Sequence, residues 1–412
     1  MKDSIQVNRA VLGISLLLGM CVNGFTVISL EVDIPEFALK DGVSLRKASF
    51  GLILRSIGSV LGAFVAGTIL DQLQPHSVIY TCIIVSAIVL GYAPHSDSYV
   101  ELYVIFSVAG ILICIIQTGV FLLIRRSFTG KTGSWLQGAQ FCFQSTICLF
   151  PLISALMSLH EVYHAMSAFA LLCGIFGFCN LWNLFRQDAR RVREETAGTG
   201  LRFAAGDFLA MCGMFFLSGS MGQTLTYLGP YVDDVQLNVN ADLILFGVTS
   251  CILISNLMMV HFQLKATTDQ AMMYFQVFAV FSSLSQLLLL AFPRSVVVAW
   301  IGFLCFGFCW GPLIGLFLDL WDRYTFIPTS YGSAVVNVGM YAGTGILAAV
   351  MFDLWDFFDN PKVLLYTNML ALVLAGGIGY SFNCVKPEKR KTLLSEDIGQ
   401  IKLQGEDDPL LE

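Results

Sequence analysis

The sequence predicts an all-α membrane protein with twelve transmembrane helices in two six-helix halves, and three observations support this. Hydrophobic residues make up 56% of the 412 residues and charged residues only 13%, whereas a soluble domain has about 25% charged residues. Twelve apolar segments have roughly the length of about 20 residues that crosses a bilayer. The longest polar run between them, Arg186–Arg202, lies near the middle of the chain with six segments on each side.

The apolar segments divide the chain into two predicted bundles. Residues 1–185 form the N-terminal six-helix bundle, with spans predicted at Val11–Leu30, Ala48–Leu70, Ser77–Tyr92, Tyr99–Ile124, Trp135–Met157 and Tyr163–Leu184. Residues 203–384 form the C-terminal six-helix bundle, with spans predicted at Phe203–Tyr227, Ala241–Phe262, Ala271–Phe292, Val296–Leu320, Thr329–Phe352 and Val363–Phe382. Residues 186–202 are the basic linker between the bundles, and residues 385–412 are a polar tail that we expect to be disordered.

The distribution of lysine and arginine predicts the orientation of the chain in the membrane. Cytoplasmic loops of membrane proteins are enriched in these residues. When both termini are placed inside, seventeen of the 23 lysines and arginines fall in inner segments, five in outer loops and one within a span. We therefore expect a multi-pass protein whose termini, linker and tail are all cytoplasmic.

The motifs that would indicate an enzyme or a metal protein are not evident. We find no Walker motif and no Gly-x-Ser-x-Gly nucleophile motif. The five histidines are scattered along the sequence, and the twelve cysteines lie in or beside apolar segments without a Cys-x-x-Cys pair. The sequence therefore predicts no catalytic residues, no metal site, no cofactor and no nucleic-acid partner; coupling to Na⁺ or H⁺ is left open.

The six-plus-six arrangement with a basic central loop resembles the major facilitator superfamily of transporters. After the second span, that superfamily carries a G-x-x-x-D-[RK]-x-G-[RK]-[RK] loop. Gly67-Thr-Ile-Leu-Asp71 matches the first half of this pattern, whereas the basic half is replaced by Gln72, Gln74, Pro75 and His76. The resemblance therefore implies a gating or charge-pairing role for Asp71, but not the full set of charge contacts at the inner gate.

Two shorter stretches are similar to one branch, the sodium-dependent glucose transporter 1-like group. One is Arg55-Ser-Ile-Gly58, continued by Gly62, in the second span. The other is Leu136-Gln-Gly-Ala-Gln140-Phe-Cys-Phe143, followed by Pro151-Leu152, where Gln140 stands in place of the group's usual histidine. The stricter signatures of ordinary sugar porters are absent, so we do not expect an ordinary facilitative hexose carrier.

Polar side chains within the spans predict where a substrate would bind, because such side chains are costly in hydrocarbon without a partner. Gln137, Gln140 and Gln144 share one face of the fifth span. Amides both donate and accept hydrogen bonds, which suits the hydroxyls of an uncharged solute. An alternative is that these side chains only tie helices together. The predicted substrate-binding residues are Gln117, Gln137, Gln140, Gln144, Gln223, Tyr227, Asn256, Trp310 and Asn337.

The tenth span carries Trp310-Gly311-Pro312, which resembles the W-G-P segment of sugar porters. There the tryptophan stacks on the sugar ring, and we expect Gly311 and Pro312 to bend the helix for gating. Arg55, within the second span, would pair with a carboxylate or meet the substrate. The alternative for Arg55 is that it reaches the outer surface of the bilayer.

The end of the tail carries a candidate sorting signal. Glu406, Leu410 and Leu411 resemble the acidic dileucine signal that clathrin adaptors read. This resemblance implies a clathrin adaptor as a partner and a location in the plasma membrane or in endosomes and lysosomes.

Taken together, these features predict a secondary-active or facilitative transporter that moves a small neutral solute, most simply a sugar, across the lipid bilayer by alternating access. Sugar symport is one form of this prediction, because coupling to Na⁺ or H⁺ is left open. One alternative is an endolysosomal carrier of another small metabolite, such as an organic anion steered by Arg55. A second alternative is a non-transporting membrane receptor or scaffold on the same fold.

Overall fold

The computed structural model describes residues 2–43, 45–128, 131–154, 156–196, 205–324 and 329–384. Every regular element in these ranges is a helix. Twelve helical spans among the described residues are long and apolar enough to cross a membrane. The predicted all-α class is therefore confirmed, because each apolar run of this length satisfies its own backbone hydrogen bonds as a helix.

The element boundaries follow the predicted spans with extensions at several ends. The N-terminal half contains α1 Lys2–Val32, α2 Ile34–Lys40, α3 Leu45–Gln72, α4 Pro75–Tyr92, the 3₁₀ turn η1 Ala93–His95, α5 Tyr99–Ser127, α6 Thr132–Ser154 and α7 Leu159–Thr196. The C-terminal half contains α8 Ala205–Asp234, α9 Ala241–Gln263, α10 Thr268–Ala291, α11 Val296–Trp310, α12 Leu313–Tyr324, α13 Ser330–Phe358, α14 Val363–Ser381 and η2 Phe382–Cys384.

Polar side chains at the helix starts explain several of these boundaries. Ser98, Asn240 and Thr329 each accept a hydrogen bond from a backbone N–H of the first helical turn. Thr267 forms a reciprocal capping box with Gln270 at the start of α10. Such caps satisfy the first N–H groups of a helix, which have no partner within the helix.

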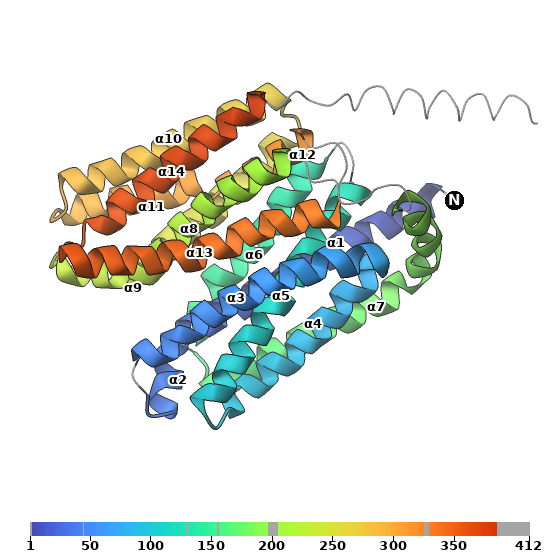
Figure 1. Cartoon of the computed structure of the whole chain (residues 1–412), viewed down its shortest axis with the longest axis horizontal. Helices are drawn as coiled ribbons and strands as arrows, with labels where there is room; N and C mark the ends of the chain where they lie inside the picture. Colours follow the sequence, from blue (N-terminus) through green and yellow to red (C-terminus); the bar gives the residue numbers. More distant parts are fainter. Residues whose placement is uncertain are drawn as a thin grey trace, which may run out of the picture.

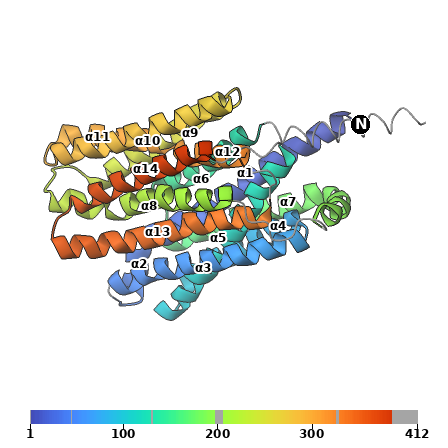
Figure 2. The same ribbon diagram turned by 45° about the horizontal axis from the view of Figure 1, so that its top comes forward.

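The helices form two bundles that lie side by side (Figures 1 and 2). Elements α1–α7 pack mainly on one another, and so do α8–α14. The halves meet where α3 and α5 contact α13 and where α6 contacts α9 and α12. The described chain begins and ends at the same end of the molecule (Figure 1). We call this the terminal end, and the opposite end, which holds α2 and η1, the far end.

The backbone of α7 continues as a helix to Thr196, so residues 186–196 of the predicted linker are helical. Residues 197–202, the tail from 385 to 412, and with it Glu406, Leu410 and Leu411, lie outside the described residues. The sorting signal therefore stays a prediction.

Glycines allow α3 and α5 to approach closely beside Arg55. A β-carbon on Gly58 would collide with the carbonyl oxygen of Ser107, and one on Gly110 with the carbonyl oxygen of Arg55. Small residues at such crossings let helix backbones touch. This contact fixes the height and rotation of α3, and so the place from which Arg55 projects.

The tenth span is interrupted at Gly311 and Pro312, between α11 and α12. Proline lacks the N–H that the helix would use and its ring crowds the preceding turn. A β-carbon on Gly311 would collide with Ser255 and with the backbone of Ile252. The interruption therefore lies where α11 is pressed against α9.

Candidate functional site

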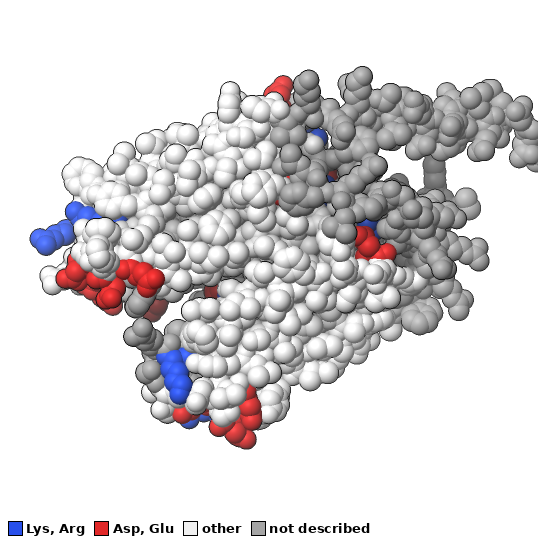
Figure 3. Space-filling model, in the orientation of Figure 1, with Lys and Arg blue, Asp and Glu red and all other residues white. Residues whose placement is uncertain are grey.

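A cavity of about 710 Å³ lies between the two halves. Its walls come from α1, α3 and α6 of the N-terminal half and from α8, α11, α12 and α13 of the C-terminal half. It reaches toward the far end, where Glu31 and Asp353 lie on its rim, and the space-filling view shows the molecule hollowed between the halves at that end (Figure 3). Cavities of a few hundred cubic ångströms suit small-molecule ligands.

Four of the nine predicted substrate-binding residues line this cavity. They are Gln140, Gln144, Tyr227 and Trp310. Gln140 and Gln144 are one helical turn apart on α6, which explains why both reach the same space. The Nε2 atom of Gln140 is buried and has no hydrogen-bond partner among the described residues. This amide is therefore a donor that a bound solute would satisfy.

The two aromatic residues are held by hydrogen bonds to neighbouring helices. The indole N–H of Trp310 donates to the carbonyl oxygen of Leu217 at 3.2 Å and to the Ser220 hydroxyl at 3.0 Å. The Tyr227 hydroxyl donates to the carbonyl oxygen of Ala348 at 3.1 Å. Trp310 is only 1% exposed, so in this conformation its ring is part of the cavity wall and does not present an open face for stacking.

The other five predicted residues do not line the cavity, and helix contacts explain why. Gln117 accepts a hydrogen bond from Tyr341, and Asn337 donates to Thr118 at 2.8 Å, which ties α5 to α13 across the halves. In this conformation Gln117 and Asn337 are buried in the contact between the halves, and a role for them in substrate binding stays a prediction.

Gln137, Asn256 and Gln223 also lie outside the cavity wall in this conformation, and their substrate-binding role likewise stays a prediction. Gln137 donates to Asn256, which joins α6 to α9 across the halves. Gln223 accepts a hydrogen bond from Thr367 at 3.1 Å and so faces α14 inside the C-terminal half. For these side chains the alternative interpretation, that they tie helices together, describes their contacts better.

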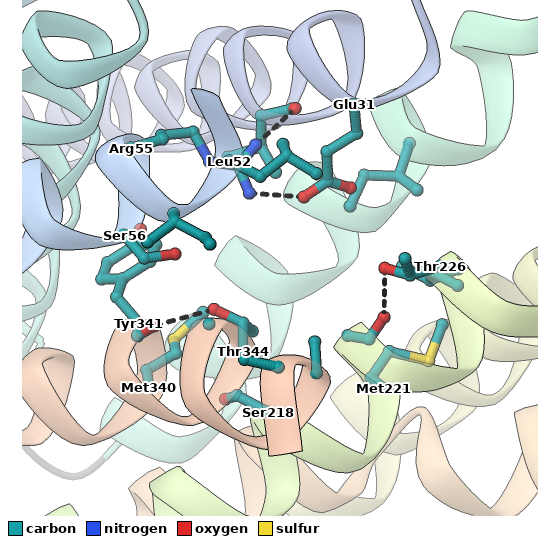
Figure 4. Close-up of a pocket in the computed structure, with 18 of the residues that line it drawn as sticks. Glu31, Leu52, Arg55, Ser56, Ser218, Met221, Thr226, Met340, Tyr341 and Thr344 are labelled. Carbon is teal, nitrogen blue, oxygen red and sulfur yellow. Dashed lines mark hydrogen bonds and ion pairs between the residues drawn. The ribbon is translucent and has the colours of Figure 1, made fainter. Parts of the chain in front are cut away.

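An ion pair lies in the cavity wall, and the carboxylate that pairs with Arg55 is Glu31, which the sequence did not single out. The Arg55 guanidinium contacts the Glu31 carboxylate at 2.5 Å and donates to the carbonyl oxygen of Val27 at 2.9 Å. Figure 4 shows both side chains on one wall, with Tyr341 and Thr344 on the opposite wall. Arg55 is 7% exposed, so it is paired within the protein and does not reach toward the bilayer surface.

Several lining residues were missed in the sequence. Glu31 ends the first span and has the pattern of an ordinary solvated helix end. Asp353 lies just beyond the predicted end of its span, which the structure extends to Phe358. Tyr341 and Thr344 share a helical face with Asn337, and this spacing pointed to them although only Asn337 was among the predicted binding residues.

Buried charges close the terminal end of the molecule. Arg125 on α5 contacts Asp322 on α12 at 2.7 Å, and both side chains are at least nine-tenths buried. The Arg125 guanidinium also lies 3.8 Å from the centre of the Trp321 ring, whose N–H donates to Asp207 at 2.8 Å. This network joins the two halves between the cavity and the terminal end.

Asp71 contributes to the same closure. It contacts Arg126 at 3.4 Å and accepts a hydrogen bond of 2.6 Å from Ser330, which belongs to the other half. The resemblance implied a charge-pairing role for Asp71, but the altered loop after the second span offered no basic partner for it. The arginines come instead from the end of α5, a position that the loop motif does not cover.

Comparison with known proteins decides the family. The model of the Major Facilitator Superfamily matches residues 16–351. This chain belongs to that superfamily. Comparison with curated proteins gave no match, and the narrower resemblance to the sodium-dependent glucose transporter 1-like group stays a prediction.

Several solved structures share the fold of this chain. The proton:xylose symporter XylE is 13% identical, with a TM-score of 0.71 over 94% of this chain and 98% of that one. The human organic anion transporter MFSD10 (TETRAN) is 16% identical, with a TM-score of 0.67 over 90% and 99%. An outward-facing bacterial homologue of the iron transporter ferroportin is 14% identical, with a TM-score of 0.68 over 90% and 99%. At these identities the likeness shows the fold alone.

Asp33 is a buried titratable residue two positions after Glu31, which lies on the rim of the cavity. Asp33 follows the first span, which ends at Glu31, and is 3% exposed. Burial, assisted by the neighbouring Glu36 carboxylate, raises the pKa of Asp33 to about 7. Asp33 does not cap α2 with its side chain, so no backbone N–H of that helix offsets the cost of a buried charge.

We expect the stability of the protein to fall between about pH 4 and pH 7 because of Asp33. An unfolded aspartate loses its proton near pH 3.9, whereas folded Asp33 keeps it up to about pH 7. The stabilising contribution is complete below about pH 4 and is lost as the pH rises through 7, by up to about 1.4 kcal/mol per pH unit.

Thermal unfolding of the purified protein across this range would test the prediction. Asp33→Asn should flatten the dependence, whereas Asp233→Asn, at an exposed position of the far end, should leave it unchanged. Identical slopes for the wild type and Asp33→Asn would contradict the assignment.

Proposed function

We propose that this protein is an alternating-access transporter of a small neutral, polyhydroxylated solute, with a sugar as the leading candidate. The observation that carries the proposal is the cavity between the halves, which extends to the far end and is closed by cross-half contacts at the terminal end. A site with access from one side at a time is what alternating access requires, and the two halves would rock about it.

The charges of the cavity favour a neutral solute over an organic anion. Arg55 is the one basic residue among the described residues that line it, and Glu31 already neutralises it at 2.5 Å. Asp353 adds a second carboxylate at the rim. An anion would have to displace Glu31 or approach a wall of net negative charge. This distribution makes a small organic cation the second candidate.

The polar groups of the cavity suit hydroxyls. Gln140 offers an unsatisfied amide N–H, and the Ser218 hydroxyl is also buried without a partner among the described residues. Gln144 and Thr344 lie on the same cavity. Amides and hydroxyls can accept or donate, so they can match either end of a sugar hydroxyl.

The membrane orientation and the coupling ion belong to the same proposal. If both termini are cytoplasmic, as the lysine and arginine distribution predicts, the far end faces outward and the structure is outward-facing. The resemblance of the tail to a sorting signal would place the protein in the plasma membrane or in an endolysosomal membrane. Coupling to Na⁺ or H⁺ would make the protein a symporter. If the protein were instead a receptor or scaffold, it would move no solute across the membrane.

Gln140→Ala is expected to weaken substrate binding while leaving the protein folded. Loss of one neutral hydrogen bond costs about 0.5–1.5 kcal/mol, which corresponds to a rise in KM of about two- to tenfold. The measurement is uptake of labelled glucose into proteoliposomes, with and without a sodium gradient.

Gln286→Ala is the matched control, because Gln286 is also a buried glutamine, lies on α10 and does not line the cavity. Equal KM values for the two variants would contradict the role of Gln140. Absence of uptake by folded wild-type protein would exclude glucose and call for tests of other neutral solutes and of cations.

A further inference from the structure

Three of the five histidines of the chain meet at the far end of the N-terminal half. We call His95, His160 and His164 the histidine cluster. The Nε2 atoms of His95 and His164 are 3.4 Å apart, and the ring of His95 lies 5.1 Å from that of His160 and 5.3 Å from that of His164. None of the three lines the transport cavity.

The sequence around two of these residues has a recognised metal-binding pattern. His160-Glu161-Val162-Tyr163-His164 matches H-E-x-x-H, so these two histidines are not scattered but have the spacing of metal ligands. In a helix this spacing places both imidazoles on one face, one turn apart. Residues 160–164 lie in the first turns of α7, so His160 and His164 project from the same face of this helix, with their ring centres 6.5 Å apart.

The hydrogen bond of His164 leaves its other nitrogen suited to a metal. The Nδ1 atom of His164 lies 2.5 Å from the carbonyl oxygen of His160, to which only an N–H can donate. In the neutral ring, Nε2 then carries the lone pair, and this arrangement is usual for metal-bound histidines. Two nitrogens bound to tetrahedral Zn²⁺ at about 2.0–2.1 Å would be roughly 3.3 Å apart. The 3.4 Å separation from His95 matches this spacing.

The backbone around the cluster is held in place. The Lys40 ammonium donates to the carbonyl oxygens of Pro94 at 2.8 Å and Ser96 at 2.5 Å, on either side of His95. Ser167 donates to the carbonyl oxygen of Ala87 at 2.7 Å, which joins α7 to α4. A metal here would therefore bind to positions that the fold has already set.

We propose that the histidine cluster binds one divalent transition-metal ion, with Zn²⁺ as the best-fitting candidate. His95 and His164 form the preset pair. No three donors among the described residues already enclose a metal position, so His160 must turn its ring inward to become the third ligand. The bound ion would clamp η1, between α4 and α5, onto the start of α7.

The site is a binding site and not a hydrolytic centre. In enzymes with H-E-x-x-H, the glutamate activates a metal-bound water. Here Glu161 accepts hydrogen bonds from the backbone N–H and the hydroxyl of Ser158, at 2.9 and 2.8 Å. Its carboxylate therefore caps the start of α7 and is occupied.

Metal titration of the full-length protein, purified without a polyhistidine tag, tests this proposal. Calorimetry with Zn²⁺ should show one site per chain with micromolar affinity, and Co²⁺ should give the absorption of a tetrahedral complex with nitrogen ligands. His95→Ala and His164→Ala should each weaken binding by at least tenfold, and His160→Ala by less.

His261→Ala is the matched control, because His261 is exposed on α9 and outside the cluster; it should bind Zn²⁺ as the wild type does. His95→Cys, which replaces one metal ligand with another, should restore binding and so shows that the alanine variants fail through lost ligation. Absence of saturable binding up to millimolar Zn²⁺ would overturn the proposal. Equal binding by the wild type, His95→Ala and His164→Ala would also overturn it, because the ion would then occupy other groups such as cysteines.

Discussion

Asp322→Asn should open the terminal end of the transporter and reduce uptake by more than tenfold. The substitution leaves the Arg125 guanidinium, whose side chain is 1% exposed, facing a neutral amide where it now meets a carboxylate at 2.7 Å. Removing one partner of a buried ion pair costs about 3–5 kcal/mol. Because the pair joins α5 to α12, this cost falls on the conformation that is closed at the terminal end.

Hydrogen–deuterium exchange at the terminal ends of α5 and α12, measured together with uptake, would check this expectation. Asp269→Asn removes an exposed carboxylate at the same end and should change neither quantity. Combining Asp322→Asn with Arg125→Gln removes both charges and should recover most of the protection. If exchange in Asp322→Asn equals that in Asp269→Asn, the pair does not hold the closed end.

Glu31→Gln should reduce uptake of a neutral solute by roughly ten- to a hundredfold. A hydrogen bond to a charged group contributes about 1.5–3 kcal/mol, and Glu31 holds Arg55 against the cavity wall at 2.5 Å. Without this carboxylate the guanidinium would be free to swing into the cavity. The same change makes the lining more positive by one charge, so a small organic anion should bind more tightly than in the wild type.

Asp353→Asn separates the effect of charge from that of geometry. It changes the charge of the cavity by the same amount but leaves the pair of Arg55 and Glu31 intact. Uptake of labelled sugar with an anionic competitor would distinguish the variants. If Glu31→Gln and Asp353→Asn behave alike, net charge alone matters; if Glu31→Gln transports a neutral solute normally, the ion pair has no role in the site.

The spans could be predicted from the sequence because the bilayer imposes a local rule. A run of about 20 apolar residues satisfies its backbone only as a helix, whichever partners it later meets. The ends of the spans could be predicted less accurately than their positions. The last span residue before Asp353 was placed at Phe352, but α13 continues to Phe358, because polar residues can extend a helix beyond the hydrocarbon.

The binding site could be predicted only in part, because helical spacing gives a face but not its neighbour. Gln137, Gln140 and Gln144 share one face of α6, yet Gln140 and Gln144 reach the cavity while Gln137 meets Asn256 of the other half. The three glutamines differ in their position along the axis of α6, and which of these positions meets the other half depends on where the halves touch. Gln223 faces α14 for a similar reason.

The sequence by itself determined the class of protein, the twelve spans and the division into two halves, because hydrophobicity and charge act on each segment separately. The tertiary structure decided which charges meet. Glu31 and Arg55 are 24 positions apart and Arg125 and Asp322 are 197 apart, and no periodicity relates them. His95 likewise meets His164 only because α4 and α7 are packed together. Pairing across helices depends on the packing of whole bundles, and a single sequence does not encode that packing in any local pattern.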